Sequence, residues 1–231
     1  MCEFNVAKAV TSLNSVRDFT ELRSILADAA GALGFTYFAL MQSNSSRTDA
    51  GGIVVLNYPT AYMQHQSETF AYRNSPILLA VRSHNAPFLW SNLATMMKLT
   101  ADHKQYMAEA AAAGLRHGFT VPIHVPGEPS GFVSFARDGE NSINEACLPQ
   151  AYFIASHAFA AGRRLKAEIV NEGARQQLES NDRKIIMLVA KGKSRWAIAR
   201  KLSVTENTVA KSLLRTKRYY QVGSQTQAVV H

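Results

Sequence analysis

The chain has 231 residues, of which 47% are hydrophobic and 18% charged, and it carries a formal net charge of +8. This fits a globular protein with one mid-sized and one small domain. Two cysteines, Cys2 and Cys147, argue against a disulfide framework and favour a reducing compartment. The N-terminus lacks the pattern of a signal peptide, and no run of about 18 apolar residues exists, so we expect a cytoplasmic protein without a membrane span.

Positive charge is concentrated in the last third of the chain. Residues 1–163 contain 11 Lys and Arg against 12 Asp and Glu, whereas residues 164–231 contain 14 against 5. The net charges of the two parts are therefore −1 and +9. Such asymmetry favours a polyanionic partner for a small C-terminal module. A solvated basic surface remains the alternative on charge alone.

Helix and strand patterns alternate in the N-terminal part. A first helix is expected at 15–33, with Ser15 as its N-cap and Gly34 as its stop. Apolar runs rich in aromatic and β-branched residues predict strands, at 35–41, 53–56, 88–90, 118–124 and 131–137. Further helices are expected at 60–72, 77–83, 100–113 and 144–169. The pattern predicts an α+β domain in which helices cover both faces of a small sheet of about five strands.

Strand signals disappear beyond a linker expected at 169–176, around Asn171-Glu172-Gly173. Four short helices are expected after it, at 178–191, at 194–202, at 205–220 and near Ser224 and Thr226. Short helices joined by tight turns are typical of a helix-turn-helix module. The expected domains are therefore 1–168 and an all-α domain at 177–231.

The helix expected at 205–220 has the composition of a DNA-recognition helix, with small or polar residues at its start and cations on its flanks. Asn207, Lys211 and Arg215 are four residues apart and are expected to face the bases of double-stranded DNA. The other expected DNA-binding residues are Lys193, Arg195, Thr205, Thr208 and Lys217. A helical bundle that binds no DNA is the alternative.

Two sets of motifs resemble one known family. The segment LVAKGKSRWAIARKLSVTENTVAKSL, followed by VGSQTQAVV, resembles the DNA-binding domain of the LuxR family. NYP at 57–59, Pro76, PFLW at 87–90 and GLRHGFTVPI at 114–123 resemble the autoinducer-binding domain of quorum-sensing LuxR-type regulators. The resemblance implies that the N-terminal domain is an α-β-α sandwich around a roughly five-stranded antiparallel sheet. It also implies a dimeric transcription regulator that needs no cofactor and binds DNA together with an acyl-homoserine lactone or a related small amphiphile.

The resemblance also implies a set of ligand-binding residues, which comprises Tyr58, Tyr62, Gln66, Ser75, Trp90, Phe119 and Ser134. Within it, Trp90 corresponds to the family's aromatic residue beside the ligand head group, and Ser134 to a hydroxyl that bonds the amide carbonyl. Gly118 corresponds to a glycine at a point of close packing.

Three ligand-site positions depart from the family pattern. Tyr62 replaces a tryptophan that bonds the lactone, Gln66 replaces a tyrosine, and Ser75 replaces an aspartate that accepts the amide N–H. A neutral hydrogen bond to Ser75 is about half as strong as a charge-assisted one. The pocket is expected to persist with altered chemistry, so the ligand could be an unusual lactone or another amphiphile. A regulator that needs no ligand is the alternative.

Other functional classes find little support in the sequence. The seven histidines show no H-E-x-x-H pattern and no Cys-His ligand spacing, and G-x-S-x-G, P-loop and G-x-G-x-x-G motifs are absent. We therefore expect neither catalysis nor a metal site. A phosphorylation-driven response regulator shares this kind of DNA-binding module, and a parallel, doubly wound sheet would favour it.

A dimer face is expected on the helix at 144–169. Its apolar residues at helical spacing are Ala151, Ile154, Ala155, Ala158 and Phe159. The competing interpretation is that this face covers the sheet.

Overall fold

The structure, a computed structural model, describes residues 5–42, 52–139, 143–177, 180–220 and 222. The chain divides into two units, Met1–Leu165 and Lys166–His231. The first unit contains helices and a sheet, whereas the described part of the second is helical. Among the described residues, no helix is both long and apolar enough to cross a membrane.

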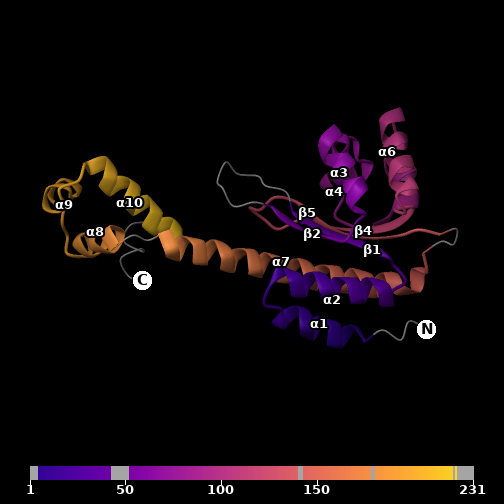
Figure 1. The fold of residues 1–231 in the computed structure, drawn as a ribbon, viewed down its shortest axis with the longest axis horizontal. Coiled ribbons are helices and arrows are strands. Elements are labelled where there is room, and N and C mark those ends of the chain that lie inside the picture. The colour runs from indigo at the N-terminus through magenta and orange to yellow at the C-terminus, as the bar shows by residue number, and fades with distance from the viewer. Residues whose placement is uncertain (1–4, 43–51, 140–142, 178–179, 221, 223–231) are drawn as a thin grey trace. The chain divides into compact units, whose positions relative to one another are not determined.

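A five-stranded sheet forms the middle layer of the first unit (Figure 1). Its strands are β1 (Tyr37–Gln42), β2 (Ile53–Leu56), β3 (Phe88–Leu89), β4 (His117–Ile123) and β5 (Gly131–Arg137). Their order is β2-β1-β5-β4-β3, and every neighbouring pair is antiparallel. The antiparallel pairing argues against the alternative of a phosphorylation-driven response regulator, for which a parallel sheet is expected.

Helices cover both faces of this sheet (Figure 1). One face carries α1 (Val6–Ser15), α2 (Phe19–Ala32) and the first part of α7 (Leu148–Gln177). The other face carries α3 (Thr60–Thr69), α4 (Pro76–Ser83), α5 (Leu93–Met96) and α6 (Ala101–Ala112). Single turns of 3-10 helix occur at η1 (Ala71–Asn74), η2 (Trp90–Asn92) and η3 (Glu145–Cys147).

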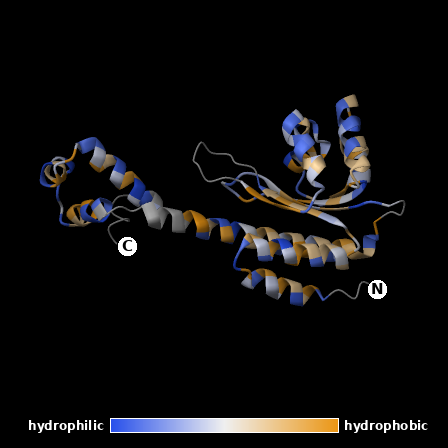
Figure 2. Cartoon of the chain, viewed as in Figure 1, coloured by the Kyte–Doolittle hydropathy of each residue, from blue (hydrophilic) through white to orange (hydrophobic). Residues whose placement is uncertain are grey.

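The two layers of helices enclose two separate hydrophobic cores. Because side chains alternate along a strand, Val133 and Phe135 of β5 enter the core under α1, α2 and α7, whereas Phe132 and Ala136 enter the core under α3 to α6. Figure 2 shows the hydrophobic colouring along the strands between the two layers. The sheet thus supplies a wall to each core.

The N-terminal helix differs from the sequence expectation, which placed one helix at 15–33. The structure has two helices, and buried Val16 between them is extended. The Asp18 carboxylate accepts the Glu21 backbone N–H at 2.8 Å, while the Glu21 carboxylate accepts the Arg17 N–H at 2.9 Å. Asp18 is therefore the N-cap of α2, three residues after the expected cap Ser15, and Glu21 bonds back to the residue before the cap.

The prediction that the apolar face of α7 forms the dimer contact is wrong. Its five residues are at most 2% exposed and belong to the core between α7 and the sheet, as the competing interpretation held. The amphipathic pattern identified an inward face, but it could not distinguish a sheet of the same chain from a second copy.

The expected linker at 169–176 is helical, because α7 continues to Gln177. The division into two units also falls earlier, between Leu165 and Lys166. Gly173 interrupts a run of good helix formers, and one glycine costs a helix only about 1 kcal/mol. The composition therefore suggested a break that the local helix propensity does not require.

The second unit contains α8 (Ser180–Ala190), α9 (Arg195–Leu202) and α10 (Glu206–Tyr219), close to three of the expected helices. The fourth, expected near Ser224 and Thr226, lies outside the described residues. The small core between the helices contains Ile185, Ile198, Ala199, Val209 and Leu213. This arrangement confirms the helix-turn-helix expectation for the described part of the unit.

Candidate functional site

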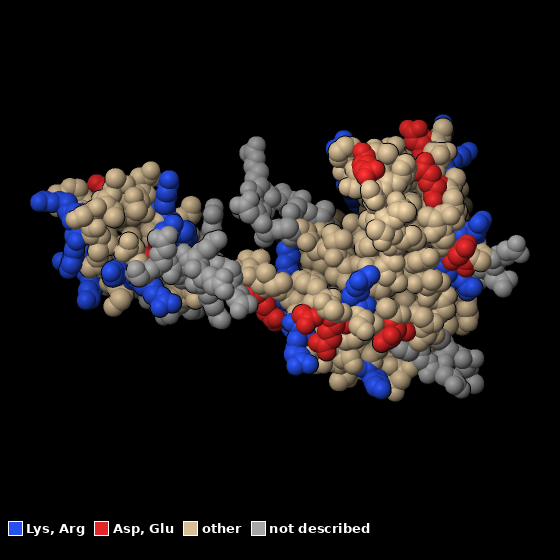
Figure 3. Space-filling model, viewed as in Figure 1, with Lys and Arg blue, Asp and Glu red and all other residues tan. Residues whose placement is uncertain are grey.

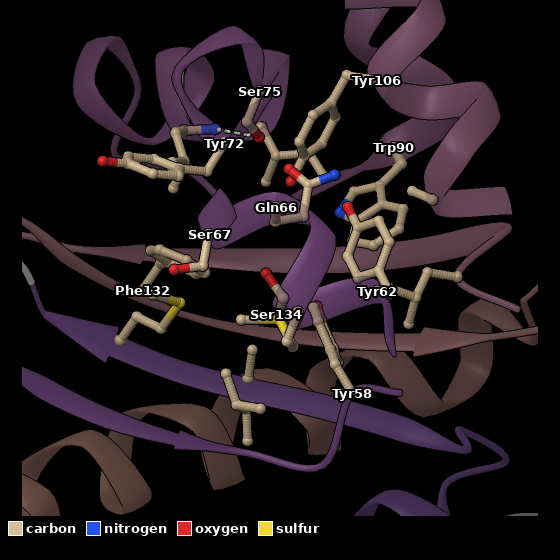
Figure 4. A pocket seen from close by; sticks show the side chains of 18 residues that line it. Tyr58, Tyr62, Gln66, Ser67, Tyr72, Ser75, Trp90, Tyr106, Phe132 and Ser134 are labelled. Carbon is tan, nitrogen blue, oxygen red and sulfur yellow. Dashed lines mark hydrogen bonds between the residues drawn. The ribbon is translucent and has the colours of Figure 1, made fainter. Parts of the chain in front are cut away.

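A cavity of about 280 Å³ lies between the sheet and the layer of α3, α4 and α6 (Figure 4). This volume is just below the usual range for small-molecule pockets, roughly 300–1,000 Å³. Its described lining residues are Ala39, Met41, Leu56, Tyr58, Tyr62, Met63, Gln66, Ser67, Tyr72, Ser75, Ile77, Leu78, Trp90, Tyr106, Ala110, Leu115, Phe132 and Ser134. None of these residues is Asp, Glu, Lys, Arg or His, so the described lining carries no formal charge.

Six of the seven expected ligand-binding residues line this cavity, namely Tyr58, Tyr62, Gln66, Ser75, Trp90 and Ser134. Tyr62 and Gln66 are one turn apart on α3, and they are the buried residues of that helix. Ser134 reaches the cavity from the middle of β5, and Trp90 from η2 at the end of β3. The structure therefore brings together side chains that are up to 76 residues apart in the chain.

Phe119 does not line the cavity, which corrects the sequence expectation. Its side chain belongs to the core on the opposite face of the sheet, together with Val121. The neighbouring Thr120 lies on the Trp90 side, because successive residues of a strand point to opposite faces. Phe119 belongs to the motif GLRHGFTVPI, but the phase of the strand decides which face of the sheet receives its side chain.

A chain of hydrogen bonds connects three side chains at the cavity wall. The Trp90 indole Nε1–H donates to Thr120 Oγ1 at 2.9 Å, and Thr120 Oγ1 lies 2.8 Å from Ser134 Oγ. Thr120 and Ser134 are directly paired across β4 and β5. If the Thr120 O–H donates to Ser134, the Ser134 O–H can in turn donate to Tyr58 or to a group in the cavity.

Ser75 combines a structural role with a place in the cavity wall. It is the N-cap of α4, and its hydroxyl oxygen accepts the Leu78 backbone N–H at 3.3 Å. Its side chain is buried, since the residue is 1% exposed. The cap uses the oxygen as an acceptor, so the hydroxyl proton can still be donated to another group.

Two tyrosines at the cavity stay neutral. Burial raises the pKa of Tyr58 far above its usual value, and the neighbouring Tyr106 adds to the shift, whereas Ser134 opposes it. Burial likewise raises the pKa of Tyr62, with further contributions from Tyr106, Tyr58 and Glu109. Their hydroxyls are therefore neutral hydrogen-bonding groups in an uncharged lining.

Sequence reasoning missed Tyr106 and Thr120. Tyr106 lines the cavity from α6, one turn before Ala110, which also lines it. The spacing of four residues on one helix was the available signal. Thr120 has no signal of its own in the sequence, because its role depends on pairing with Ser134 across the sheet.

The second unit carries a basic surface. Figure 3 shows Lys and Arg gathered on the helical unit that contains α8 to α10. Seven of the eight expected DNA-binding residues are exposed there, namely Lys193, Arg195, Thr205, Asn207, Thr208, Lys211 and Arg215. Lys193 and Arg195 flank Ser194, whose hydroxyl accepts the Ala197 N–H and begins α9.

Thr205 and Thr208 organise the start of α10. Thr205 Oγ1 accepts the Thr208 backbone N–H at 3.1 Å, and the two hydroxyl oxygens lie 2.8 Å apart. Asn207 and Lys211 follow one turn apart on α10. Lys217 is half-buried near the end of the helix.

Arg215 has a partner within the protein, which the sequence did not indicate. Its Nε and Nη2 donate to the two carboxylate oxygens of Asp182 at 3.1 and 2.8 Å. Asp182 is fully buried on α8, whereas the Arg215 side chain is 44% exposed. The guanidinium thus joins α10 to α8 rather than extending toward the face of Asn207 and Lys211.

Comparison with known families agrees with both units. Residues 18–162 match the autoinducer binding domain, and residues 176–231 match bacterial regulatory proteins of the luxR family. The chain belongs to the LuxR family. The first LuxR-family match contains all of the described cavity lining, and the second contains α8, α9 and α10.

Two LuxR-family relatives illustrate the extent of the similarity. The transcriptional activator LuxR of Aliivibrio fischeri is 22% identical over 228 residues, which cover 96% of this chain and 90% of that protein. The HTH-type transcriptional regulator y4qH of Sinorhizobium fredii is 27% identical over 179 residues, 76% of this chain. The matched part spans about half, 54%, of the length of y4qH.

Solved structures with the same fold include SdiA of Escherichia coli. Its crystal structure superposes with a TM-score of 0.61 at 22% identity and covers 97% of this chain and 94% of that one. A second SdiA structure, in complex with octanoyl-rac-glycerol, gives a TM-score of 0.60 and covers 97% of this chain and 91% of that one. Both confirm the LuxR-type fold predicted for the whole chain.

Proposed function

We propose that this protein regulates transcription in response to a small, uncharged amphiphile that binds in the cavity of its first unit. The observation that carries the proposal is the cavity itself, where an uncharged lining brings the hydroxyls of Tyr58, Tyr62 and Ser134 to one apolar space. Such a lining suits an apolar chain with a few polar atoms in its head group. A charged ligand would lose its hydration there without a charged partner.

Acyl-homoserine lactones and related amphiphiles fit this description. The match to the autoinducer binding domain supports a signal of this kind. The complex of SdiA with octanoyl-rac-glycerol supports the wider class, because that ligand is a neutral amphiphile without a lactone. The small cavity favours ligands of short or medium chain length.

The second unit is the proposed DNA-binding part, acting in the cytoplasm on double-stranded DNA as a homodimer. A single helix-turn-helix buries little surface, and proteins of this kind read two half-sites as dimers. With the inner face of α7 buried, the proposed dimer surface is the outer face, where Tyr152 is 47% and Phe153 48% exposed. His157 packs on Phe153, with ring centroids 4.7 Å apart.

A thermal-shift screen tests the ligand half of the proposal. The full chain is heated with acyl-homoserine lactones of several chain lengths and, separately, with octanoyl-glycerol. A ligand that binds the folded state raises its stability by RT ln(1 + [L]/Kd).

Sedimentation at micromolar protein concentration, with the best compound present, tests the dimer. The wild type is expected to sediment as a dimer and the variant Phe153→Glu as a monomer.

The second candidate is a regulator that works without a lactone or without any ligand. The observation that favours it is Ser75, a neutral hydroxyl that caps α4 by accepting the Leu78 N–H, at the position where the family pattern has an aspartate. If no compound shifts the melting temperature and the ligand-free protein binds its DNA fully, the first unit serves as a scaffold. That result would remove the sensing half of the proposed function.

A further inference from the structure

Gln66 is an unusual residue in the cavity wall. It is 4% exposed, and it lines the cavity from the middle of α3. Neither its Nε2 nor its Oε1 has a hydrogen-bond partner among the described residues. Buried polar groups are nearly always bonded, so an amide with both ends unpartnered calls for a physical explanation.

The position of Gln66 gives no structural reason for an amide. Tyr62, one turn earlier, and Gln66 are the buried residues of α3, a face on which apolar side chains are the usual choice. Figure 4 shows the Gln66 side chain among Tyr62, Ser75 and Tyr106. The last torsion of a glutamine side chain is soft, so the amide edge can turn toward a ligand without movement of the helix.

We propose that Gln66 selects ligands whose head group presents a hydrogen-bond donor and acceptor on the same edge, namely a primary amide or a lactam. This inference rests on the proposed function, and it names the ligand class. The carboxamide of Gln66 itself presents N–H and C=O side by side, and a primary amide or a lactam matches both atoms at once. An ester or a tertiary amide matches only the N–H.

Charge enters the selection as well. The described lining contains no cation that could pair with a carboxylate, and no anion that could pair with an amine. A fatty acid anion is therefore expected to bind this cavity more weakly than a neutral amide of the same chain length. Selection by Gln66 and exclusion of charge together define a neutral, amide-bearing amphiphile.

The test combines two variants with three matched probes, octanamide, N,N-dimethyloctanamide and octanoate. Gln66→Met keeps the length of the side chain and removes its hydrogen-bonding atoms. Gln64→Met is the control, because Gln64 lies on the same helix, is exposed and bonds Glu68 at 2.8 Å. Melting temperatures and dissociation constants are measured for the full chain.

The first expected result needs no ligand. Ligand-free Gln66→Met melts about 2–6 °C above the wild type, because it no longer buries an unpartnered amide. Gln64→Met stays within about 1 °C of the wild type, as expected for a surface substitution. A lower melting temperature for Gln66→Met would show that the amide has partners inside the protein, and it would overturn the inference.

The second expected result concerns selectivity. The measured quantity is the dissociation constant of N,N-dimethyloctanamide divided by that of octanamide. This ratio is expected to be about five- to tenfold larger for the wild type and Gln64→Met than for Gln66→Met, the factor for one neutral hydrogen bond. Comparing this ratio between variants cancels the bulk of the two methyl groups. Octanoate is expected to bind most weakly to all three proteins.

If the wild type binds amides but the ratio is equal in Gln66→Met, the role of Gln66 is refuted while ligand binding stands. If it binds neither amides nor any compound of the earlier screen, the proposed ligand function fails, and this inference fails with it.

Discussion

Gly118 and Trp90 pack so closely that no side chain fits between them. A Cβ placed on Gly118 would lie 2.2 Å from Cε2 and 2.3 Å from Cδ2 of the indole. The indole is held in this position by its bond to Thr120, at 2.9 Å. The absence of a side chain at 118 therefore sets the position of one wall of the cavity.

Gly118→Ala is expected to push Trp90 out of place and to break its bond to Thr120. Overpacking of this kind costs about 1–3 kcal/mol of unfolding free energy. In a Trp196→Phe background, where Trp90 is the remaining tryptophan, its fluorescence should shift toward that of a solvated indole. Gly31→Ala is the control, because a Cβ there meets nothing within 4 Å. Unchanged stability and fluorescence in Gly118→Ala would contradict the packing argument.

Ser75→Asp is expected to improve binding of N-octanoyl-homoserine lactone. Aspartate can still cap α4, and its carboxylate supplies a charged acceptor for the ligand N–H. A gain on the order of 1–2 kcal/mol corresponds to about tenfold or more in affinity, measurable by calorimetry. Ser75→Ala, which removes the cap, should cost about 1 kcal/mol of stability without any gain in affinity. Equal lactone affinity in wild type and Ser75→Asp would argue against a ligand amide near position 75.

Alkaline pH is expected to destabilise the first unit through its buried tyrosines. The pKa of Tyr62 is raised in the folded state, mainly by burial. The stabilisation is complete below the unfolded pKa of about 10 and is lost as the pH rises further, because only the unfolded chain then releases the proton. Urea titrations across this pH range should show a smaller decrease in the free energy of unfolding for Tyr62→Phe than for the wild type. The same slope in both proteins would show that Tyr62 ionises as readily in the folded state.

Lys211→Ala is expected to weaken DNA binding. Lys211 is exposed on α10, one turn after Asn207. Loss of a base contact costs on the order of 1–3 kcal/mol of discrimination, whereas loss of a phosphate contact lowers the salt slope by about one. Lys104→Ala, an exposed lysine on α6 of the other unit, serves as the control. If Lys211→Ala changes neither affinity nor salt dependence, the assignment of α10 as the recognition helix is wrong.

Arg215→Met is expected to destabilise the second unit. It leaves the fully buried Asp182 carboxylate without the two bonds that Arg215 donates. Removing one partner of such a pair costs about 3–5 kcal/mol when both are buried, and the partial exposure of Arg215 favours the lower end. The double variant Asp182→Leu/Arg215→Met should regain much of the loss, and Arg183→Met should show none. Calorimetry in which Arg215→Met melts like the wild type would favour a base-reading role instead.

Local patterns in the sequence were sufficient for most of the secondary structure. The strand at 53–56 and the strand at 131–137 have the bounds that their apolar runs predict, and Thr100 begins α6 as its N-cap. The serine N-cap at 194 and the threonine at 205 likewise mark the starts of α9 and α10. These features depend on interactions within a few residues, which a single sequence displays directly.

What only the tertiary structure decided is which partner each side chain meets. Phe119 lies in the core opposite the cavity, the apolar face of α7 covers its own sheet, and Arg215 binds Asp182, 33 residues earlier in the chain. Periodicity shows that a face is apolar, and composition shows that a residue is charged, but neither identifies the surface across from it. The same holds for the amide of Gln66. The sequence cannot show that it lacks a hydrogen-bond partner among the described residues, because this depends on where the neighbouring side chains lie.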